Sequence, residues 1–171
     1  ISYDGGMNWT QKFANRTTSV IINKQSPNIV YVAVQGNGIY RSMDGGKSWV
    51  QVLSVNSTTG ASSLSMDMTN PRILYASMWQ HRRYPWIMES GGANSGLYKS
   101  TDGGDTWNKM EEGLPKEFGK SGISVSRANP ERIFAVIEAE GDKSGVYRSD
   151  DGGKKWKQIK SKSRKNLIGV F

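Results

Sequence analysis

The sequence predicts an all-β fold made of repeated four-stranded antiparallel sheets, and three observations support this prediction. One eight-residue motif occurs four times, as SYDGGMNW (2–9), SMDGGKSW (42–49), STDGGDTW (100–107) and SDDGGKKW (149–156). The last three copies each follow a proline, an apolar run and a Gly-aliphatic-Tyr-basic-Ser segment. No stretch shows the 3.6-residue apolar period of an amphipathic helix, so we expect almost no helix.

Each repeat unit divides into four predicted strands. The first alternates apolar and polar residues, and the second is a continuous apolar run, which is typical of a strand covered on both faces. The third is the Gly-aliphatic-Tyr-basic-Ser segment, and the fourth begins at the motif tryptophan. The apolar runs of the second strands occupy residues 29–34, 73–79 and 133–139.

These units predict blades of a β-propeller. Four-stranded repeats of roughly 40–60 residues stack face to face in this architecture, because one blade alone cannot bury its own faces. We place the last strand of a preceding blade in residues 1–16, three complete blades in 17–55, 61–112 and 120–161, and the first strand of a following blade in 166–171. Closed propellers usually have about four to eight blades. The sequence therefore predicts a partial propeller, which belongs to a longer chain or closes by self-association.

The repeated motif is best interpreted as a rigid turn. Its paired glycines tolerate positive φ, and its aspartate can accept hydrogen bonds from backbone N–H groups two and three residues on. The serine hydroxyl can add another bond, and the tryptophan ring can cover the turn or pack on the next blade. The residues assigned this structural role are Ser2, Asp4, Gly6, Trp9, Ser42, Asp44, Gly46, Trp49, Ser100, Asp102, Gly104, Trp107, Ser149, Asp151, Gly153 and Trp156.

The four motifs match the pattern Ser-x-Asp-x-Gly-x-x-Trp, and the whole chain resembles the Asp-box, or bacterial neuraminidase repeat, propellers. That repeat occurs in sialidases, xyloglucan-cleaving glycoside hydrolases, sortilin-type luminal domains and photosystem II assembly factors. The chain looks most like bacterial exported sortilin-type or glycosyl-hydrolase-like repeat proteins. The resemblance implies an exported protein, which is periplasmic, on the cell surface or extracellular. It also implies that the motif lies between the third and fourth strands, away from the ligand-binding face.

Composition and charge limit the possible chemistry. Cysteine is absent and His81 is the single histidine, so neither a thiolate site nor a multi-histidine metal site can form, and we expect no metal and no cofactor. No run of about 18 apolar residues is present, so we expect no membrane span. Nucleic acid is not an expected partner.

The net charge of +8 comes largely from one basic run at residues 154–165. The simpler interpretation is a solvated outer strand and loop, and the alternative is a contact with an anionic polymer, a phosphate surface or an acidic partner. The basic residues of this run are Lys154, Lys155, Lys157, Lys160, Lys162, Arg164 and Lys165.

The blade at 61–112 carries an insertion between its second and third strands, at residues 78–95. Successive turns of an antiparallel blade lie at alternate ends, so we expect this insertion at the end opposite the motif turns. Aromatic side chains and arginines in a loop suit sugar faces, carboxylates or peptides. An alternative is that the loop packs over its own blade, anchored by Pro85 and Trp86. The ligand-binding candidates are Trp79, His81, Arg82, Arg83, Tyr84 and Trp86.

Three functions fit this sequence. We favour a binding or scaffold module of an exported propeller, with a protein or a glycan as ligand. The alternatives are a segment of a sialidase-like or xyloglucanase-like glycoside hydrolase, and an assembly factor that binds a partner protein. We lean against catalysis in this segment, because no pair stands out among the carboxylates expected at the ligand end, Glu89, Glu138, Glu140 and Asp142.

Overall fold

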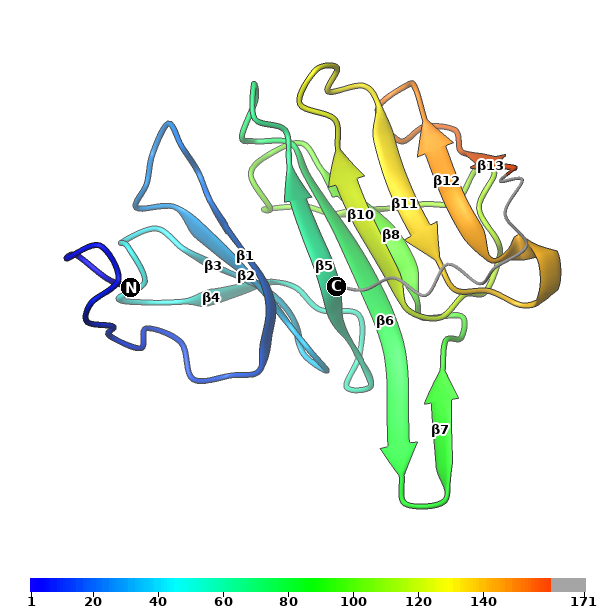
Figure 1. Ribbon diagram of the computed structural model, residues 1–171, viewed down its shortest axis with the longest axis horizontal. Coiled ribbons are helices and arrows are strands. Elements are labelled where there is room, and N and C mark those ends of the chain that lie inside the picture. The colour runs from blue at the N-terminus through cyan, green and yellow to red at the C-terminus, as the bar shows by residue number, and fades with distance from the viewer. Residues whose placement is uncertain (161–171) are drawn as a thin grey trace.

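The computed structural model describes residues 1–160 and confirms the all-β prediction (Figure 1). Three antiparallel sheets follow one another along the described chain, and we call them blades 1, 2 and 3. A single 3₁₀ turn, η1 (Gly141–Lys143), is the one helical element in this part of the chain. No helix within residues 1–160 is long and apolar enough to span a membrane.

Each blade has its four strands in sequence order. Blade 1 contains β1 (Thr17–Ile22), β2 (Val30–Val34), β3 (Gly38–Ser42) and β4 (Val50–Leu53). Blade 2 contains β5 (Thr59–Met66), β6 (Leu74–Tyr84), β8 (Gly96–Ser100) and β9 (Asn108–Met110), and β7 (Ile87–Ser90) pairs with the far end of β6. Blade 3 contains β10 (Ser121–Val125), β11 (Ile133–Ile137), β12 (Gly145–Ser149) and β13 (Lys157–Ile159).

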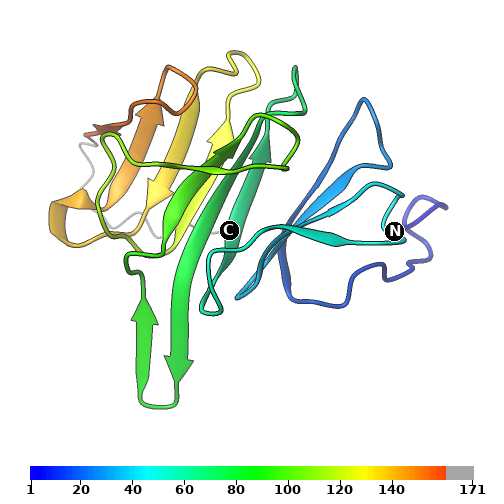
Figure 2. The ribbon, with the colours of Figure 1, turned by 180° about the vertical axis from the view of Figure 1, so that it is seen from behind.

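Figures 1 and 2 show the three sheets following one another across the molecule. Apolar cores fill the spaces between neighbouring blades. Tyr31 and Ile39 of blade 1 pack with Leu74 and Met78 of blade 2 in the first core. Residues on the opposite face of blade 2, such as Leu97, pack with blade 3 in the second core. Blade 2 is therefore covered on both faces, which explains the continuous apolar run of β6.

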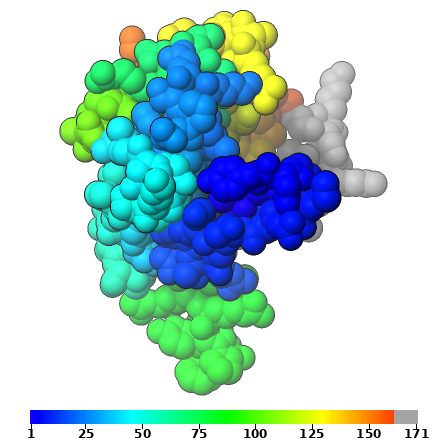
Figure 3. All heavy atoms as spheres, turned by 90° about the vertical axis from the view of Figure 1, so that its left-hand side faces the viewer, coloured from blue at the N-terminus to red at the C-terminus, as the bar shows by residue number. Residues whose placement is uncertain are grey.

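Residues 1–16 contain the first motif turn but no strand. Ile1 and Thr10 exchange backbone hydrogen bonds of 2.6 and 2.8 Å, and the Phe13 ring lies 5.0 Å from that of Trp49. Figure 3 shows this segment in dark blue, lying on blade 1. The fourth strand of a blade pairs with the third strand of the same blade. In the described part of the chain, no third strand lies beside residues 1–16. The strand expected at 166–171 lies outside the described residues.

The motif turn is held by hydrogen bonds within itself. In blade 2 the Ser100 hydroxyl donates to Asp102 Oδ1 over 2.8 Å and accepts from the Gly104 N–H over 2.8 Å. The Asp102 carboxylate accepts from the Thr106 N–H at 3.0 Å and from the Thr106 hydroxyl at 2.6 Å. The aspartate thus accepts from the amide four residues on, and in blade 1 Asp44 also accepts from the Lys47 N–H three residues on, at 2.9 Å. The amide two residues after the aspartate donates to the serine hydroxyl instead. Both glycines have positive φ, +82° and +90°.

The motif tryptophans differ in their surroundings. Trp9 and Trp107 each donate the indole N–H to the carbonyl of the second glycine of their own turn, at 2.9 and 3.1 Å. Trp49 donates to the Lys12 carbonyl at 3.0 Å instead. Trp156 is buried, and its indole N–H has no partner among the described residues. The ring covers its own turn at Trp9 and Trp107, and Trp107 also packs against the first core. Trp156 lies within the second core.

The first glycine of the motif joins neighbouring blades. The Gly103 carbonyl in blade 2 accepts from the Tyr31 hydroxyl at 2.7 Å and from Arg41 Nη1 at 2.8 Å, both in blade 1. The Gly152 carbonyl in blade 3 accepts in the same way from Tyr75 at 3.2 Å and Lys99 at 2.7 Å. We call this arrangement the blade lock. Burial raises the pKa of both tyrosine hydroxyls, so they stay protonated and remain donors at neutral pH.

Blade 3 carries Phe134 and Arg148 at the two donor positions of the lock, as the strand register shows. Phenylalanine has no hydroxyl to donate. Arg148 is engaged within its own blade, because its Nε lies 2.9 Å from Asp150 Oδ2. The outward side of blade 3 therefore lacks the tyrosine donor that both other blades use.

The inner strands are joined by side-chain hydroxyls. Thr18 in β1 donates to the Ala61 carbonyl of β5 at 2.9 Å, and Ser62 in β5 donates to the Ser121 carbonyl of β10 at 2.7 Å. Thr18 and Ser62 both sit where the register of their strand shifts by one residue. These bulges turn a hydroxyl toward the next blade, so the blades are fixed at the motif end and along the inner edge.

We expect Tyr31→Phe to destabilise the protein by about 0.5–1.5 kcal/mol, because the substitution removes one buried hydrogen bond and keeps the ring. Tyr40→Phe is the matched control, since no described residue hydrogen-bonds the Tyr40 hydroxyl and its ring packs against that of Phe13. Urea unfolding followed by circular dichroism measures both. Equal stability of the two variants would contradict the blade lock.

The motif carboxylates make the folding stability depend on pH in the acidic range. The Asn8 amide and the Ser2 hydroxyl lower the pKa of Asp4 from 3.8 to about 2. The Thr106 hydroxyl and amide likewise hold the pKa of Asp102 well below its usual range. A lowered pKa in the folded state stabilises the fold above the unfolded pKa, and that stabilisation is lost as the pH falls toward the folded pKa.

We therefore expect Asp102→Asn to lower the thermal midpoint at neutral pH and to flatten its decline between about pH 4 and pH 2. Differential scanning calorimetry across this range tests the slope. Asp142→Asn, an exposed carboxylate outside the motifs, should keep the wild-type slope. A wild-type slope in Asp102→Asn would show that the turn does not depend on the ionised carboxylate.

Candidate functional site

The insertion at residues 78–95 forms a projecting β-hairpin. β6 runs beyond its blade to Tyr84, turns at Pro85 and Trp86, and returns as β7. The first residue of β6, Leu74, pairs with Ser100 at the start of the motif, so the hairpin leaves the blade at the opposite end (Figure 1). The Trp86 side chain is 81% exposed. The alternative in which Pro85 and Trp86 anchor the insertion onto its own blade is therefore wrong.

The six candidate residues form two aromatic pairs rather than one cluster. The Trp79 and His81 rings lie 4.3 Å apart at the root of the hairpin, and the Tyr84 and Trp86 rings stack 5.8 Å apart at its tip. Opposite residues of a two-stranded ribbon share a face and successive residues alternate. The remaining two candidates, Arg82 and Arg83, therefore lie on opposite faces of the hairpin.

A hydrogen-bonded chain fixes the root of the hairpin to blade 3. The Trp79 indole N–H donates to Ser90 Oγ at 3.1 Å, and Ser90 Oγ donates to Glu138 Oε2 at 3.0 Å. The same carboxylate oxygen accepts the Lys120 backbone N–H at 2.9 Å. A Cβ at Gly119 would lie 2.5 Å from Glu138 Oε2, so a larger residue there would displace this carboxylate from its present position. Glu138, a candidate acid in the sequence, serves here as a structural acceptor.

A second set of contacts holds the outgoing and returning chains of the hairpin together. The Gly91 N–H donates to the Gln80 carbonyl at 2.9 Å, and the Gln80 N–H donates to Ser95 Oγ at 3.0 Å. The Asn94 side-chain amide donates to Gln80 Oε1 at 3.0 Å. The root is therefore braced on both sides, and residues 82–89 beyond it are all exposed.

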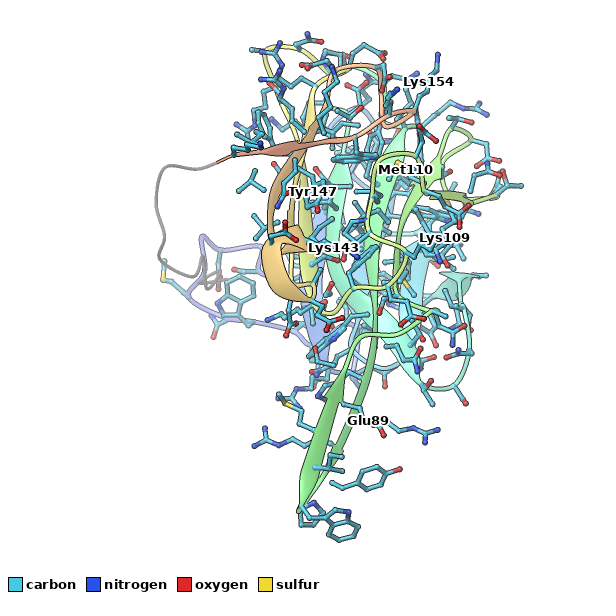
Figure 4. All side chains as sticks on the ribbon, turned by 90° about the vertical axis from the view of Figure 1, so that its right-hand side faces the viewer. Glu89, Lys109, Met110, Lys143, Tyr147 and Lys154 are labelled. Carbon is cyan, nitrogen blue, oxygen red and sulfur yellow. The ribbon has the colours of Figure 1, made fainter. Side chains whose placement is uncertain are left out.

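The other charged candidates are spread over the molecule. Figure 4 labels Glu89 on the hairpin and Lys154 near the opposite end of the blades. Glu140 and Asp142 lie in the loop after β11, at the same end as the hairpin. In the basic run, Lys154, Lys155, Lys157 and Lys160 are exposed, and Lys162, Arg164 and Lys165 lie outside the described residues.

Within residues 1–160, no group of three or more His, Cys, Asp or Glu side chains could hold a metal ion. A concavity of about 220 Å³ lies where the ends of β1, β5 and β10 meet, lined mainly by apolar side chains such as Ile21, Leu64 and Val125. None of the six candidate residues lines it. It lies at the motif end of the blades, away from the hairpin.

The sequence did not single out every residue that matters here. Ser90 and Lys120 are ordinary polar residues, and their roles arise only because blade 3 approaches the hairpin. Tyr31 and Tyr75 were also missed as lock residues, although both stand at the same place in the apolar run of a second strand. A tyrosine repeated at the same position of two buried strands indicates a shared hydrogen bond of its hydroxyl, and this pattern could have identified both residues.

Comparison with known proteins places the chain among propellers. The family model described as "Sortilin, neurotensin receptor 3" matches residues 1–145. No curated protein matches the sequence. A solved glycoside hydrolase, NkGH74 from Niastella koreensis, is 24% identical with a TM-score of 0.68, and the match covers 90% of this chain and 25% of that one.

Two further structures show the same fold. The GH74 xyloglucanase from Xanthomonas campestris is 22% identical with a TM-score of 0.64, covering 84% of this chain and 21% of the enzyme. YCF48 bound to D1 peptide is 17% identical with a TM-score of 0.53, covering 88% of this chain and 43% of that protein. The chain thus spans about a quarter or less of the two hydrolases and under half of YCF48.

We expect Glu138→Ala to loosen the root of the hairpin, because it removes the acceptor of the Ser90 hydroxyl and the Lys120 amide. Loss of a hydrogen bond to a charged acceptor should speed hydrogen exchange at the Lys120 amide by about tenfold. Exchange measured by NMR tests this, with Glu140→Ala as the control. Unchanged exchange in Glu138→Ala would mean that the root is held by other contacts.

Proposed function

Because the chain belongs to the sortilin-Vps10 family, we propose that it is a binding module of a β-propeller and holds a protein or glycan ligand at its hairpin end. The proposal includes the exported location that the resemblance to Asp-box proteins implies. The motif turns and the blade lock serve as the frame, and the β6–β7 hairpin presents the ligand-binding side chains.

The observation that carries this proposal is the group of exposed apolar side chains on the hairpin. Trp86 is 81% exposed, Met88 61%, Ile87 49% and Tyr84 42%. Large apolar side chains gathered at one exposed place typically mark an interaction surface. Tyrosine, tryptophan and arginine are also the residues that contribute most often to binding energy.

The relatives support both classes of ligand. One solved structure of similar fold is a xyloglucanase, and another is YCF48 in complex with a peptide. A propeller of this kind can therefore act on a polysaccharide or hold a peptide. An assembly role would be one form of the second activity.

The glycoside hydrolase alternative has weaker support. Hydrolysis needs two carboxylates across a cleft, about 5–9.5 Å apart depending on mechanism. Glu138 is the carboxylate best placed near the hairpin, and it already binds Ser90 and the Lys120 amide. The arrangement at this end serves attachment of the hairpin rather than proton transfer.

The test uses two arrays probed with the purified chain. One array carries xyloglucan oligosaccharides and other glycans, and the other carries short peptides in which pairs of valines alternate with pairs of glutamates or of lysines. We expect binding to one array, and we expect Trp86→Ala and Arg83→Ala each to weaken it by at least about tenfold. Trp9→Ala is the matched control, because Trp9 is also largely exposed but lies in the first motif turn.

The outcomes test separately whether the chain binds a ligand and whether the hairpin is the binding site. Binding that is equally tight in Trp86→Ala and the wild type would place the ligand away from the hairpin. If the chain binds neither array, the proposal that it is a binding module is wrong. Release of reducing sugar from xyloglucan by the purified chain would favour the hydrolase instead.

A further inference from the structure

We propose that the uncovered edge of β6, residues 82–84, binds an extended acidic segment of a partner protein as an added β-strand. This inference rests on the proposed function, because it names the ligand class of the same hairpin. It depends on three features of the edge, namely its missing neighbour strand, the direction of its backbone groups and its charge.

β6 is longer than the strand beside it. The pairing of β5 with β6 ends at Thr59 and Gln80, and β6 continues for four more residues. On that side the last hydrogen bond runs from the His81 N–H to the Thr58 carbonyl, at 3.2 Å. Figure 2 shows β6 extending past the neighbouring strand into the hairpin. The place beside residues 82–84 is occupied by no strand of the described chain.

Two hydrogen bonds fix the direction in which the free backbone groups point. The Gln80 carbonyl accepts from the Gly91 N–H, so the backbone groups of residues 80, 82 and 84 point toward the returning chain of the hairpin. The His81 N–H points the other way, toward Thr58. Arg83, two residues on, therefore directs its N–H and C=O away from β7, toward the empty side. An unpaired donor and acceptor at a strand edge are a template for another strand.

The charge of the edge defines the partner. Arg82 and Arg83 are both exposed and lie on opposite faces, so an added strand meets a cation on each of its faces. Glu89 of β7 lies across from Arg82 on the other side of β6, and Arg83 lies across from the uncharged Met88. Opposite charges directly across two strands stabilise the pair, and like charges destabilise it. A segment with acidic residues on both faces fits, and an apolar residue opposite Tyr84 would add contact with its exposed ring.

A second copy of this chain is a poorer occupant of the same edge. Pairing two β6 edges would bring four arginines together, and each chain carries a net charge of +8. The arginines therefore act against self-pairing and for an acidic strand, which is a common way to obtain specificity at an exposed edge.

The experiment measures fluorescence anisotropy of a labelled peptide in which pairs of valines alternate with pairs of glutamates, so that acidic side chains lie on both faces of the added strand. We expect the wild type to bind it at least tenfold more tightly than the same peptide N-methylated along its backbone, because N-methyl groups block the hydrogen bonds of an added strand. The Arg82→Glu, Arg83→Glu double variant should lose the valine–glutamate peptide and bind the valine–lysine peptide instead. NMR spectra of the variant verify that the blades remain folded.

Two results would overturn the strand-addition proposal. Equal affinity for the plain and N-methylated peptides would mean that side chains alone hold the ligand. Binding of glycans but no peptide, with loss in Trp86→Ala, would also overturn it while leaving the binding module and its hairpin site intact. A failure of the proposed function is different, since the wild type would then bind neither glycan nor peptide.

Discussion

The carbonyl of one glycine sets the spacing of the blades. It belongs to a motif turn and receives a tyrosine hydroxyl and a basic side chain from the blade before it, as at Gly103 and Gly152. The carbonyl is available only because the serine and aspartate of the motif bond the turn internally and the glycines adopt positive φ. The repeated motif is therefore both a turn and the acceptor of the blade lock. The apolar cores pack between blades whose separation these bonds define.

The lock also determines which parts of a blade are free to vary. It occupies the motif end of each blade, and the hydroxyl bridges occupy the inner edge, so these regions are committed to holding the sheets together. The end that carries the β6–β7 hairpin has fewer such constraints. There the chain can leave the blade, expose aromatic side chains and stop pairing on one side. The division between a fixed end and a variable end follows from the antiparallel order of the strands.

Most of the fold could be predicted from the sequence, because strand alternation, the motif and the spacing are all local signals. The site was predictable only in part. The six candidate residues lie on one hairpin, but they do not form one cluster. Successive residues of a strand point to opposite faces, and the turn at Pro85 and Trp86 lies at the far end of the hairpin from its root. The contact of Ser90 with Glu138 could not be predicted, because it joins residues 48 positions apart through the approach of two blades.

Among the described residues, the hairpin contacts its neighbours near its root, through His81, Ser90 and the segment around Lys120, while residues 82–89 are all exposed. Its length and sequence can therefore change during evolution without altering the distance or angle between blades. A lineage could lengthen, exchange or delete this element and keep the same frame. Divergence of function among such propellers can then proceed by editing single insertions, one blade at a time, while the motif turns stay recognisable.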